Sequence, residues 1–202
     1  MLKNPVHRPM FDSSHRILKT ERGRFAIFQS ADGRLATGWL ELLKPDAARR
    51  QGIDLESEHD HQLLPDLSDR LLKALAGEPV DFDDVPTPRG SAFQEACWNA
   101  ARAIPRGEIR TYAQLASDSG HPRAARAVGQ AMRHNPLPII VPCHRVVSAA
   151  GLGGFAGEVD GGFGLRIKSH LLFAEGVDMG PNKARCVSAC IADNQDMAMP
   201  LA

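Results

Sequence analysis

The chain has 202 residues and contains little that would place it outside the cytoplasm. No stretch approaches the roughly 18 consecutive apolar residues of a membrane span, so we expect no transmembrane helix and no membrane partner. The first ten residues contain no apolar run of the signal-peptide type, and the expected location is therefore the cytoplasm. The four cysteines, at positions 97, 143, 186 and 190, have no disulfide-framework spacing, and we expect them to be free thiols.

The chain also lacks net charge, because 24 lysines and arginines balance 24 aspartates and glutamates. The distribution is uneven, however. Residues 46–90 carry eleven acidic side chains against five lysines and arginines, whereas residues 98–147 carry seven arginines against Glu108 and Asp118. This asymmetry suggests that one half meets a polyanion, although two solvated faces that offset each other would have the same composition.

The first half of the chain predicts α/β structure. Residues 24–30 and 34–40 are apolar runs on either side of Asp32 and Gly33, a pattern typical of a β-hairpin. Residues 66–78 predict a helix that ends at Gly77, with Leu67, Leu71, Leu72 and Leu75 on its apolar side. Residues 78–90 are acidic and proline-rich without a helical period, which predicts a linker. The expected division is a domain over 1–85, a second domain over 86–177 and a loosely attached tail over 178–202.

The second half predicts a helix-turn-helix. Ser91 with Gln94, and Thr111 with Gln114, each match a capping box at the start of a helix. Residues 119–122 predict a tight turn, and Pro122 suits the first turn of the third helix. Two helices joined by a glycine-containing turn are typical of this motif. In the first of these helices Cys97 shares a stripe with Phe93, Ala101 and Ile104, which predicts a core position for that thiol.

The third helix, over 122–135, has two distinct sides. At about 100° per residue, a polar stripe of Arg123, Arg126, Gln130 and Arg133 lies opposite Ala125, Val128 and Met132. The small Ala127 and Ala131 border the stripe, so the helix backbone could come close to a nucleic-acid groove. A solvent-facing stripe is the alternative, but the spacing and the preceding turn together favour DNA contact.

Cys143 lies in "IIVPCHRVV", between Pro142 and His144. Proline restricts the backbone, so Pro142 and the earlier Pro138 would hold the thiol in a fixed place. The adjacent His144 is a possible base, and Arg145 predicts a positive field that favours thiolate. A base needs an orienting partner, and Glu175 is the only acidic residue in 165–176. The alternative is a buried, inert thiol.

Three further motifs predict no cofactor and no metal site. The "HDH" of residues 59–61 could hold a metal, but its acidic surroundings favour a solvated loop. The "CVSAC" of residues 186–190 has no partner ligands nearby in sequence. The glycine-rich "GLGGFAG" of residues 151–157 does not have the dinucleotide-binding pattern, which favours a lid over the site.

Residues 91–176 resemble the catalytic domain of the O6-alkylguanine-DNA alkyltransferases, also called methylated-DNA–protein-cysteine methyltransferases. The resemblance runs through "IPRGEIRTYAQLA", "GHPRAARAVGQAMRHNPLPIIVPCHRVV" and "GLGGFAG". It implies an N-terminal α/β domain of ribonuclease-H-like type, which the first 85 residues match more loosely, and a mainly α, winged-helix-like catalytic domain that contains the helix-turn-helix. It implies a monomeric DNA-repair enzyme that binds the minor groove of double-stranded DNA and extrudes an alkylated guanine. The alkyl group of O6-alkylguanine or O4-alkylthymine would pass irreversibly to Cys143.

The resemblance also implies roles for single residues. Cys143 would accept the alkyl group, His144 would act as its general base through a water, and Glu175 would orient the imidazole. Asn135 would brace the segment that carries the cysteine. Lys168 would approach this network from the last helix, which is expected over 169–176 and its N-terminal flank.

Other matched residues would meet the DNA. Tyr112 would contact the phosphate beside the extruded nucleotide and assist protonation of the leaving guanine. Arg126 would fill the gap left in the duplex, and the rest of the DNA contact set is Arg123, Ala127, Gln130 and Ala131. The pocket for the base would be lined by Pro142, Val146, Phe155 and Ala156.

The chain departs from the family pattern beside this pocket. Phe155 and Ala156 stand where many relatives have Tyr and Ser, and the loop near 158–164 is several residues longer. Both differences bear on lesion preference. Two other functions are compatible with parts of the sequence: a lesion sensor, which would lack a cysteine at position 143, and a cysteine hydrolase, which would not explain the arginine stripe.

Overall fold

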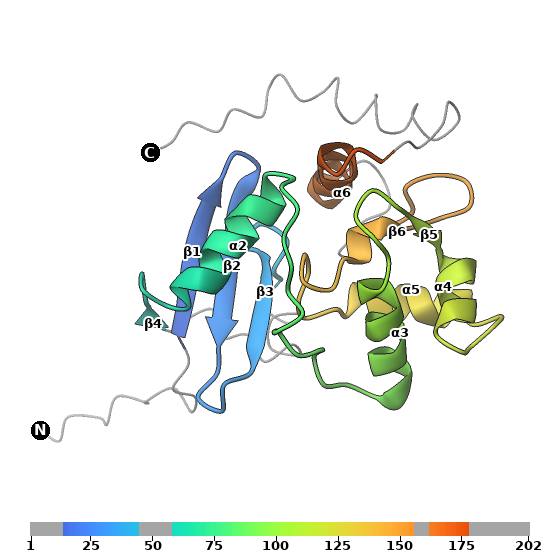
Figure 1. Cartoon of the computed structure of the whole chain (residues 1–202), viewed down its shortest axis with the longest axis horizontal. Coiled ribbons are helices and arrows are strands. Elements are labelled where there is room, and N and C mark those ends of the chain that lie inside the picture. Colours follow the sequence, from blue (N-terminus) through green and yellow to red (C-terminus); the bar gives the residue numbers. More distant parts are fainter. Residues whose placement is uncertain (1–13, 45–57, 156–161, 178–202) are drawn as a thin grey trace, which may run out of the picture.

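The apolar runs of the first half form a mixed sheet in the computed structural model, which describes residues 14–44, 58–155 and 162–177 (Figure 1). Strands β1 (Ser14–Thr20), β2 (Gly23–Gln29) and β3 (Leu35–Trp39) are antiparallel, and β4 (Glu58–His59) pairs with β1 in parallel. The strand order is β3-β2-β1-β4, so β3 is an edge strand. The hairpin at Asp32 and Gly33 is confirmed, with Gly33 at φ 80°. The sequence did not predict β1, because Leu18 is its one fully buried residue.

Helix α2 (Pro65–Leu75) packs on one face of this sheet. Its Leu67, Leu71 and Leu75 join Phe25 and Ile27 in one buried cluster. The predicted helix is confirmed, but the assignment of Leu72 to its apolar side was wrong. Leu72 lies about 100° around the helix from Leu71, and 36% of its surface is exposed.

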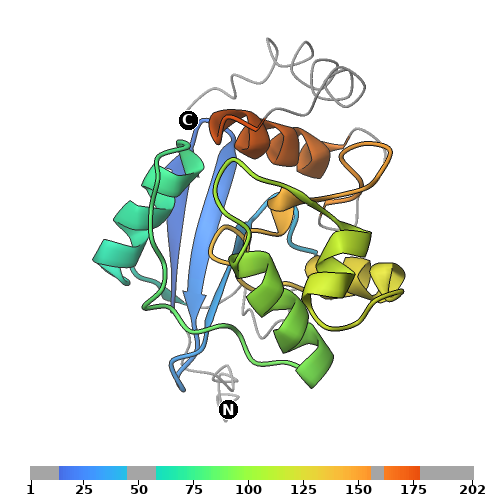
Figure 2. The ribbon, with the colours of Figure 1, turned by 45° about the vertical axis from the view of Figure 1, so that its right-hand side comes forward.

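Three helices form the opposite end of the molecule (Figures 1 and 2): α3 (Ala92–Arg102), α4 (Tyr112–Asp118) and α5 (Ala125–Arg133). Both capping boxes are confirmed, since the Ser91 and Thr111 hydroxyls accept bonds from the backbone N–H groups of Gln94 and Gln114. Cys97 is fully buried in α3, as predicted. Because these caps depend on local sequence, they define where α3 and α4 begin.

The turn between α4 and α5 is longer than the sequence predicted. Pro122 was expected inside the third helix, but it lies in the turn, and α5 begins at Ala125. The Ala124 N–H bonds to the His121 carbonyl and closes a turn before the helix starts. Arg123 adopts a left-handed backbone with φ 79° in this turn. The placement of Arg123 on the helical stripe was therefore wrong.

Two short parallel strands connect the helices to the cysteine segment. Strand β5 (Arg110–Thr111) pairs with β6 (Val146–Val147), which directly follows the 3-10 helix η1 (Cys143–Arg145). Helix α6 (Phe163–Ala174) begins earlier than the expected position 169 and buries most of its surface. It lies above both the sheet and the helical end in Figure 2. The pairing of β5 with β6 brings the start of α4 next to the residues that follow Cys143.

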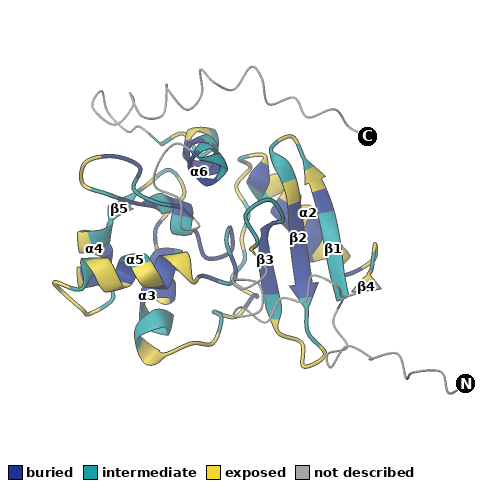
Figure 3. Cartoon of the chain, turned by 180° about the vertical axis from the view of Figure 1, so that it is seen from behind, coloured by how far each residue is buried: buried dark blue, intermediate teal, exposed yellow. Residues whose placement is uncertain are grey.

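Buried side chains run without interruption from the sheet to the helical end (Figure 3). Residues 78–90 are irregular, as predicted, but they are anchored to helices on both sides. Arg102 of α3 donates to the carbonyls of Phe82 and Val85, and Arg70 of α2 binds the Asp84 carboxylate. A division near residue 85 stays a prediction, because both halves contribute to a single core.

The C-terminal ends of α2 and α6 meet at Gly77. This residue has φ 85°, and an added Cβ would lie 2.7 Å from the Ala174 Cβ and 2.8 Å from the Ala174 carbonyl oxygen. The Arg106 guanidinium donates to the carbonyls of Gly77 and Ala174, and thus binds the ends of both helices. Glycine is required here for its backbone conformation and for the close approach.

We predict that Gly77→Ala lowers the free energy of unfolding by about 3 kcal/mol or more, because it adds a steric clash to a left-handed backbone that costs roughly 1–2 kcal/mol. Gly33→Ala is the matched control, since Gly33 has φ 80° and nothing lies within 4 Å of the added Cβ. Urea unfolding of both variants measures the difference. Equal losses would show that the contact with Ala174 contributes nothing.

Candidate active site around Cys143

The segment that carries Cys143 is braced from inside by a buried amide. Asn135 donates from Nδ2 to the Val141 carbonyl at 2.8 Å and accepts the Leu137 N–H at Oδ1 at 2.9 Å. The Cys143 N–H bonds to the Val141 carbonyl at 2.8 Å. Prolines interrupt the segment and remove backbone donors, so the Asn135 side chain supplies bonds that the backbone cannot. These contacts determine where the thiol lies.

The thiol itself is protonated at neutral pH. Burial raises the pKa of Cys143, although a hydrogen bond with Asn135 and the charge of Lys168 oppose the rise. The prediction that Arg145 favours thiolate was wrong. Arg145 binds both oxygens of Glu175 at 2.9 Å and the Ile104 carbonyl at 2.7 Å, so its charge is offset by a carboxylate. Transfer from this thiol therefore needs a base.

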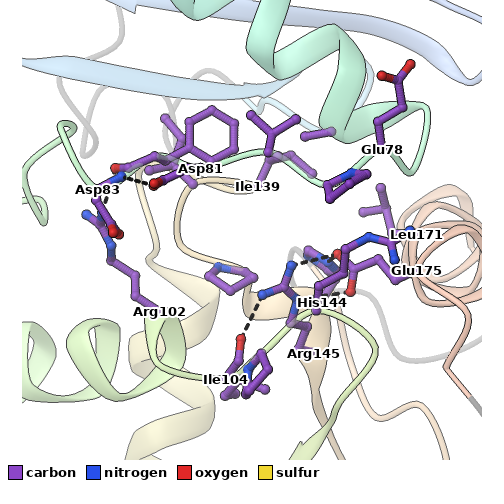
Figure 4. A pocket seen from close by; sticks show the side chains of 18 residues that line it. Glu78, Asp81, Asp83, Arg102, Ile104, Ile139, His144, Arg145, Leu171 and Glu175 are labelled. Atoms are coloured by element: carbon purple, nitrogen blue, oxygen red, sulfur yellow. Dashed lines mark hydrogen bonds and ion pairs between the residues drawn. The ribbon is translucent and has the colours of Figure 1, made fainter.

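His144 is positioned to be that base. It is 2% exposed, and its Nε2 lies 2.9 Å from Oε1 of Glu175 at the end of α6 (Figure 4). Burial lowers the pKa of His144 despite the nearby carboxylate, so the ring is neutral at neutral pH. Burial opposes ionisation of Glu175, but hydrogen bonds with His144 and Arg145 outweigh it and lower the pKa of this carboxyl to about 2. A neutral ring beside a carboxylate donates from Nε2, which leaves Nδ1 free to accept a proton.

Lys168 and Tyr112 meet at the glycine-rich loop. Lys168 donates to the carbonyls of Val146 at 2.6 Å and Gly154 at 3.1 Å, and burial lowers its pKa to about 8. The Tyr112 hydroxyl donates to the same Gly154 carbonyl at 3.4 Å. Gly153 permits this approach, because a Cβ there would lie 3.0 Å from the Tyr112 ring. The loop is thus fixed against Lys168 and Tyr112, and the Val146 carbonyl already binds Lys168.

The other residues expected in the base pocket differ in how much surface they offer. Val146 and Pro142 are buried, and Phe155 is 7% exposed with its ring 6.1 Å from that of Trp39 in β3. Ala156 lies outside the described residues. Phe155 therefore packs against the sheet, and its role in a pocket stays a prediction.

The exposed face of α5 is basic. Arg126, Ala127, Gln130 and Arg133 are exposed, whereas Val128 and Met132 are buried as predicted. The expectation that Ala131 borders this face was wrong. Ala131 is 3% exposed, and its carbonyl accepts the Trp98 Nε1–H at 3.0 Å, so it packs against α3. Arg123 is exposed as well, but it lies in the preceding turn.

A cavity of about 310 Å³ lies behind His144 and Glu175 (Figure 4). Residues 78–83 and the end of α3 line its other walls, while Cys143, Tyr112 and Lys168 do not line it. It is thus separate from the side on which the thiol lies. Among the described residues, no group of three or more His, Cys, Asp and Glu side chains could hold a metal ion. The "CVSAC" motif falls outside the described residues, and none of the described helices is long and apolar enough to cross a membrane.

Comparison with known proteins places this geometry in a family. Residues 92–177 match the 6-O-methylguanine DNA methyltransferase, DNA binding domain. The methylated-DNA–protein-cysteine methyltransferase of Methanosarcina acetivorans is 45% identical over 118 residues, which cover 58% of this chain and 72% of that protein. This chain belongs to the methylated-DNA–protein-cysteine methyltransferase family.

Other relatives support the same assignment over different lengths. A Mycolicibacterium paratuberculosis methyltransferase is 51% identical, and the match spans 42% of this chain and 52% of that protein, about half its length. A crystal structure of Mycobacterium tuberculosis OGT in complex with DNA superposes with a TM-score of 0.65 and 34% identity. The superposition covers 80% of this chain and 92% of that one, so the likeness includes the sheet as well as the helices.

The ionisation of Glu175 predicts a dependence of stability on pH. Its pKa lies at about 2 in the folded chain and near 4.5 when unfolded, so its charge contributes roughly 3 kcal/mol above pH 4.5 that is lost as the pH falls towards 2. We expect Glu175→Gln to be more destabilising at pH 6 than at pH 2 by about this amount.

Urea unfolding at several pH values measures this difference. Glu108→Gln is the control, since it removes a half-exposed carboxylate that pairs with Arg110 at 3.1 Å, and such surface pairs contribute little. A destabilisation by Glu175→Gln that is the same at every pH would contradict the assignment of an ionised, buried carboxylate.

Proposed function

We propose that this chain repairs double-stranded DNA by transferring the alkyl group of O6-alkylguanine to Cys143. The observation that carries the proposal is the bond of 2.9 Å between Nε2 of His144 and Glu175, next in sequence to a thiol braced by Asn135. This is the arrangement of nucleophile, base and orienting carboxylate that activates a protonated thiol. The names of the relatives supply the substrate class.

The transfer is a displacement at the alkyl carbon. The Cys143 thiol gives its proton to Nδ1 of His144, through a water, as its sulfur forms a bond to that carbon. The bond from the carbon to O6 breaks, and the leaving guanine takes a proton with help from the Tyr112 hydroxyl. The products are an unmodified guanine and a thioether on Cys143. Water does not cleave a thioether, so each molecule reacts once.

The base must leave the duplex before the sulfur can reach it. Guanine O6 lies inside the helix, and extrusion costs a few kcal/mol, which a poorly paired, damaged base lowers. We infer that α5 enters the minor groove with Arg126 in the gap and Gln130 and Ala127 beside it. The same pocket would accept O4-alkylthymine. We further infer that the protein acts as a monomer in the cytoplasm.

The first test follows the label. Incubation with DNA that contains O6-methylguanine should add one methyl mass to the peptide with Cys143 and stop at one equivalent, as mass spectrometry measures. Cys97→Ser should react like the wild type, because Cys97 is fully buried against Ser119, and Cys143→Ser should not react. Multiple turnovers would indicate a hydrolase, and a label on Cys97 would refute the assignment.

The second test separates extrusion from chemistry. Arg126→Ala should slow repair of duplex DNA about tenfold to a hundredfold, since it removes compensation for part of the few kcal/mol that extrusion costs. Its reaction with free O6-benzylguanine, which needs no extrusion, should stay within about twofold. Arg133→Ala is the control, because Arg133 is exposed at the opposite end of α5. Equal losses on both substrates would show that Arg126 does not fill the gap.

A further inference from the structure

Thr37 is a buried hydroxyl of the N-terminal sheet that contacts the cysteine segment. It lies in edge strand β3 and is 1% exposed. Its N–H donates to the Pro136 carbonyl at 2.9 Å, and its Oγ1–H donates to the Pro138 carbonyl at 3.0 Å, across 101 residues of sequence. Both donors of one residue thus bind the stretch that leads to Cys143.

The stretch needs such external contacts because it has few of its own. Pro136, Pro138 and Pro142 have no N–H groups, so backbone bonds within the stretch are limited to those of Leu137, Val141 and Cys143. Ile139, next to the bonded Pro138, has φ 78°, a left-handed conformation that costs a β-branched residue roughly 1–3 kcal/mol. A strained backbone persists only where its surroundings determine it, and Thr37 is part of those surroundings.

Asn135 and Thr37 therefore act on the stretch from two different sides. Asn135 bonds within it, at Leu137 and Val141, and Thr37 bonds at Pro136 and Pro138 from β3. The Val141 carbonyl that Asn135 binds also accepts the Cys143 N–H. A shift of Pro138 would move this network, and with it the sulfur relative to His144.

We propose that Thr37 is a positioning residue for alkyl transfer: its hydroxyl holds the stretch 136–143 so that the Cys143 sulfur meets the alkyl carbon and the base in line. This role rests on the proposed function. Thr37 does not touch the reacting atoms. Its effect arises because displacement depends on near-attack geometry, and a misplacement of about 1 Å can cost roughly a hundredfold in rate.

The test compares two reactions of the same thiol. Thr37→Val keeps the shape and the backbone N–H but removes the hydroxyl. It should slow single-turnover transfer from free O6-benzylguanine about tenfold, since part of the alignment is lost. Iodoacetamide labelling of Cys143, followed by mass spectrometry, should be as fast as in the wild type or faster, because this small reagent needs no alignment. Thr37→Ser keeps the hydroxyl and should transfer within about twofold of the wild type.

Thr20→Val is the matched control. The Thr20 hydroxyl donates to the Gly23 carbonyl at 2.7 Å in the turn between β1 and β2, so the variant makes the same chemical change in the same sheet but without contact to the cysteine segment. It should not alter transfer. All rates are measured at a temperature where circular dichroism shows the variants folded, and Thr37→Ala replaces Thr37→Val if the latter does not fold.

The outcomes separate this role from others. Equal transfer by Thr37→Val and Thr20→Val overturns the role of Thr37. Equal slowing of transfer and of labelling by Thr37→Val also overturns it, because a general loss of thiol reactivity or of structure would act on both reactions. Failure of the wild type to transfer the benzyl group to Cys143, with Cys143 still labelled by iodoacetamide, counts against the proposed function instead.

Discussion

The carboxylate of Glu175 is the contact on which the site depends. It is ionised and nearly buried, and it binds His144 and Arg145 at once. A buried charge is stable only when partners satisfy it, so the end of α6, the residues after Cys143 and, through Arg145, the Ile104 carbonyl at the end of α3 must keep one arrangement. The same bond selects the tautomer of His144. A single carboxylate thus couples the packing of three elements to the state of the base.

A protonated resting thiol suits a protein that must react with one substrate. Burial keeps Cys143 as a thiol, and thiols are poor nucleophiles compared with thiolates. The neutral His144 can remove the proton only when an electrophilic carbon is in place to complete the step. Small electrophiles and oxidants therefore meet a weakly reactive sulfur, and selectivity follows from the environment of the thiol as well as from recognition of DNA.

Local features of the fold were predictable and long-range ones were not. The capping boxes at Ser91 and Thr111 and the hairpin at Gly33 depend on neighbouring residues, and the structure confirms them. Pro122 was misplaced because the turn closes through His121 before α5 begins. The charge of Arg145 was misjudged because its partner lies 30 residues away, and Thr37 gave no signal because its bonds span 101 residues. Glu175 was found because it is the one acidic residue in its helical segment.

The separation of charge has a consequence for how the molecule approaches a polyanion. Exposed aspartates gather on α2 and the stretch after it, whereas exposed arginines lie on and before α5, at the other end of the molecule (Figure 1). With a net charge of zero, such a distribution produces no overall attraction but a large electric dipole. The field of a nucleic acid exerts a torque on that dipole before contact occurs. The molecule therefore rotates as it diffuses inward, and α5 reaches the phosphates first.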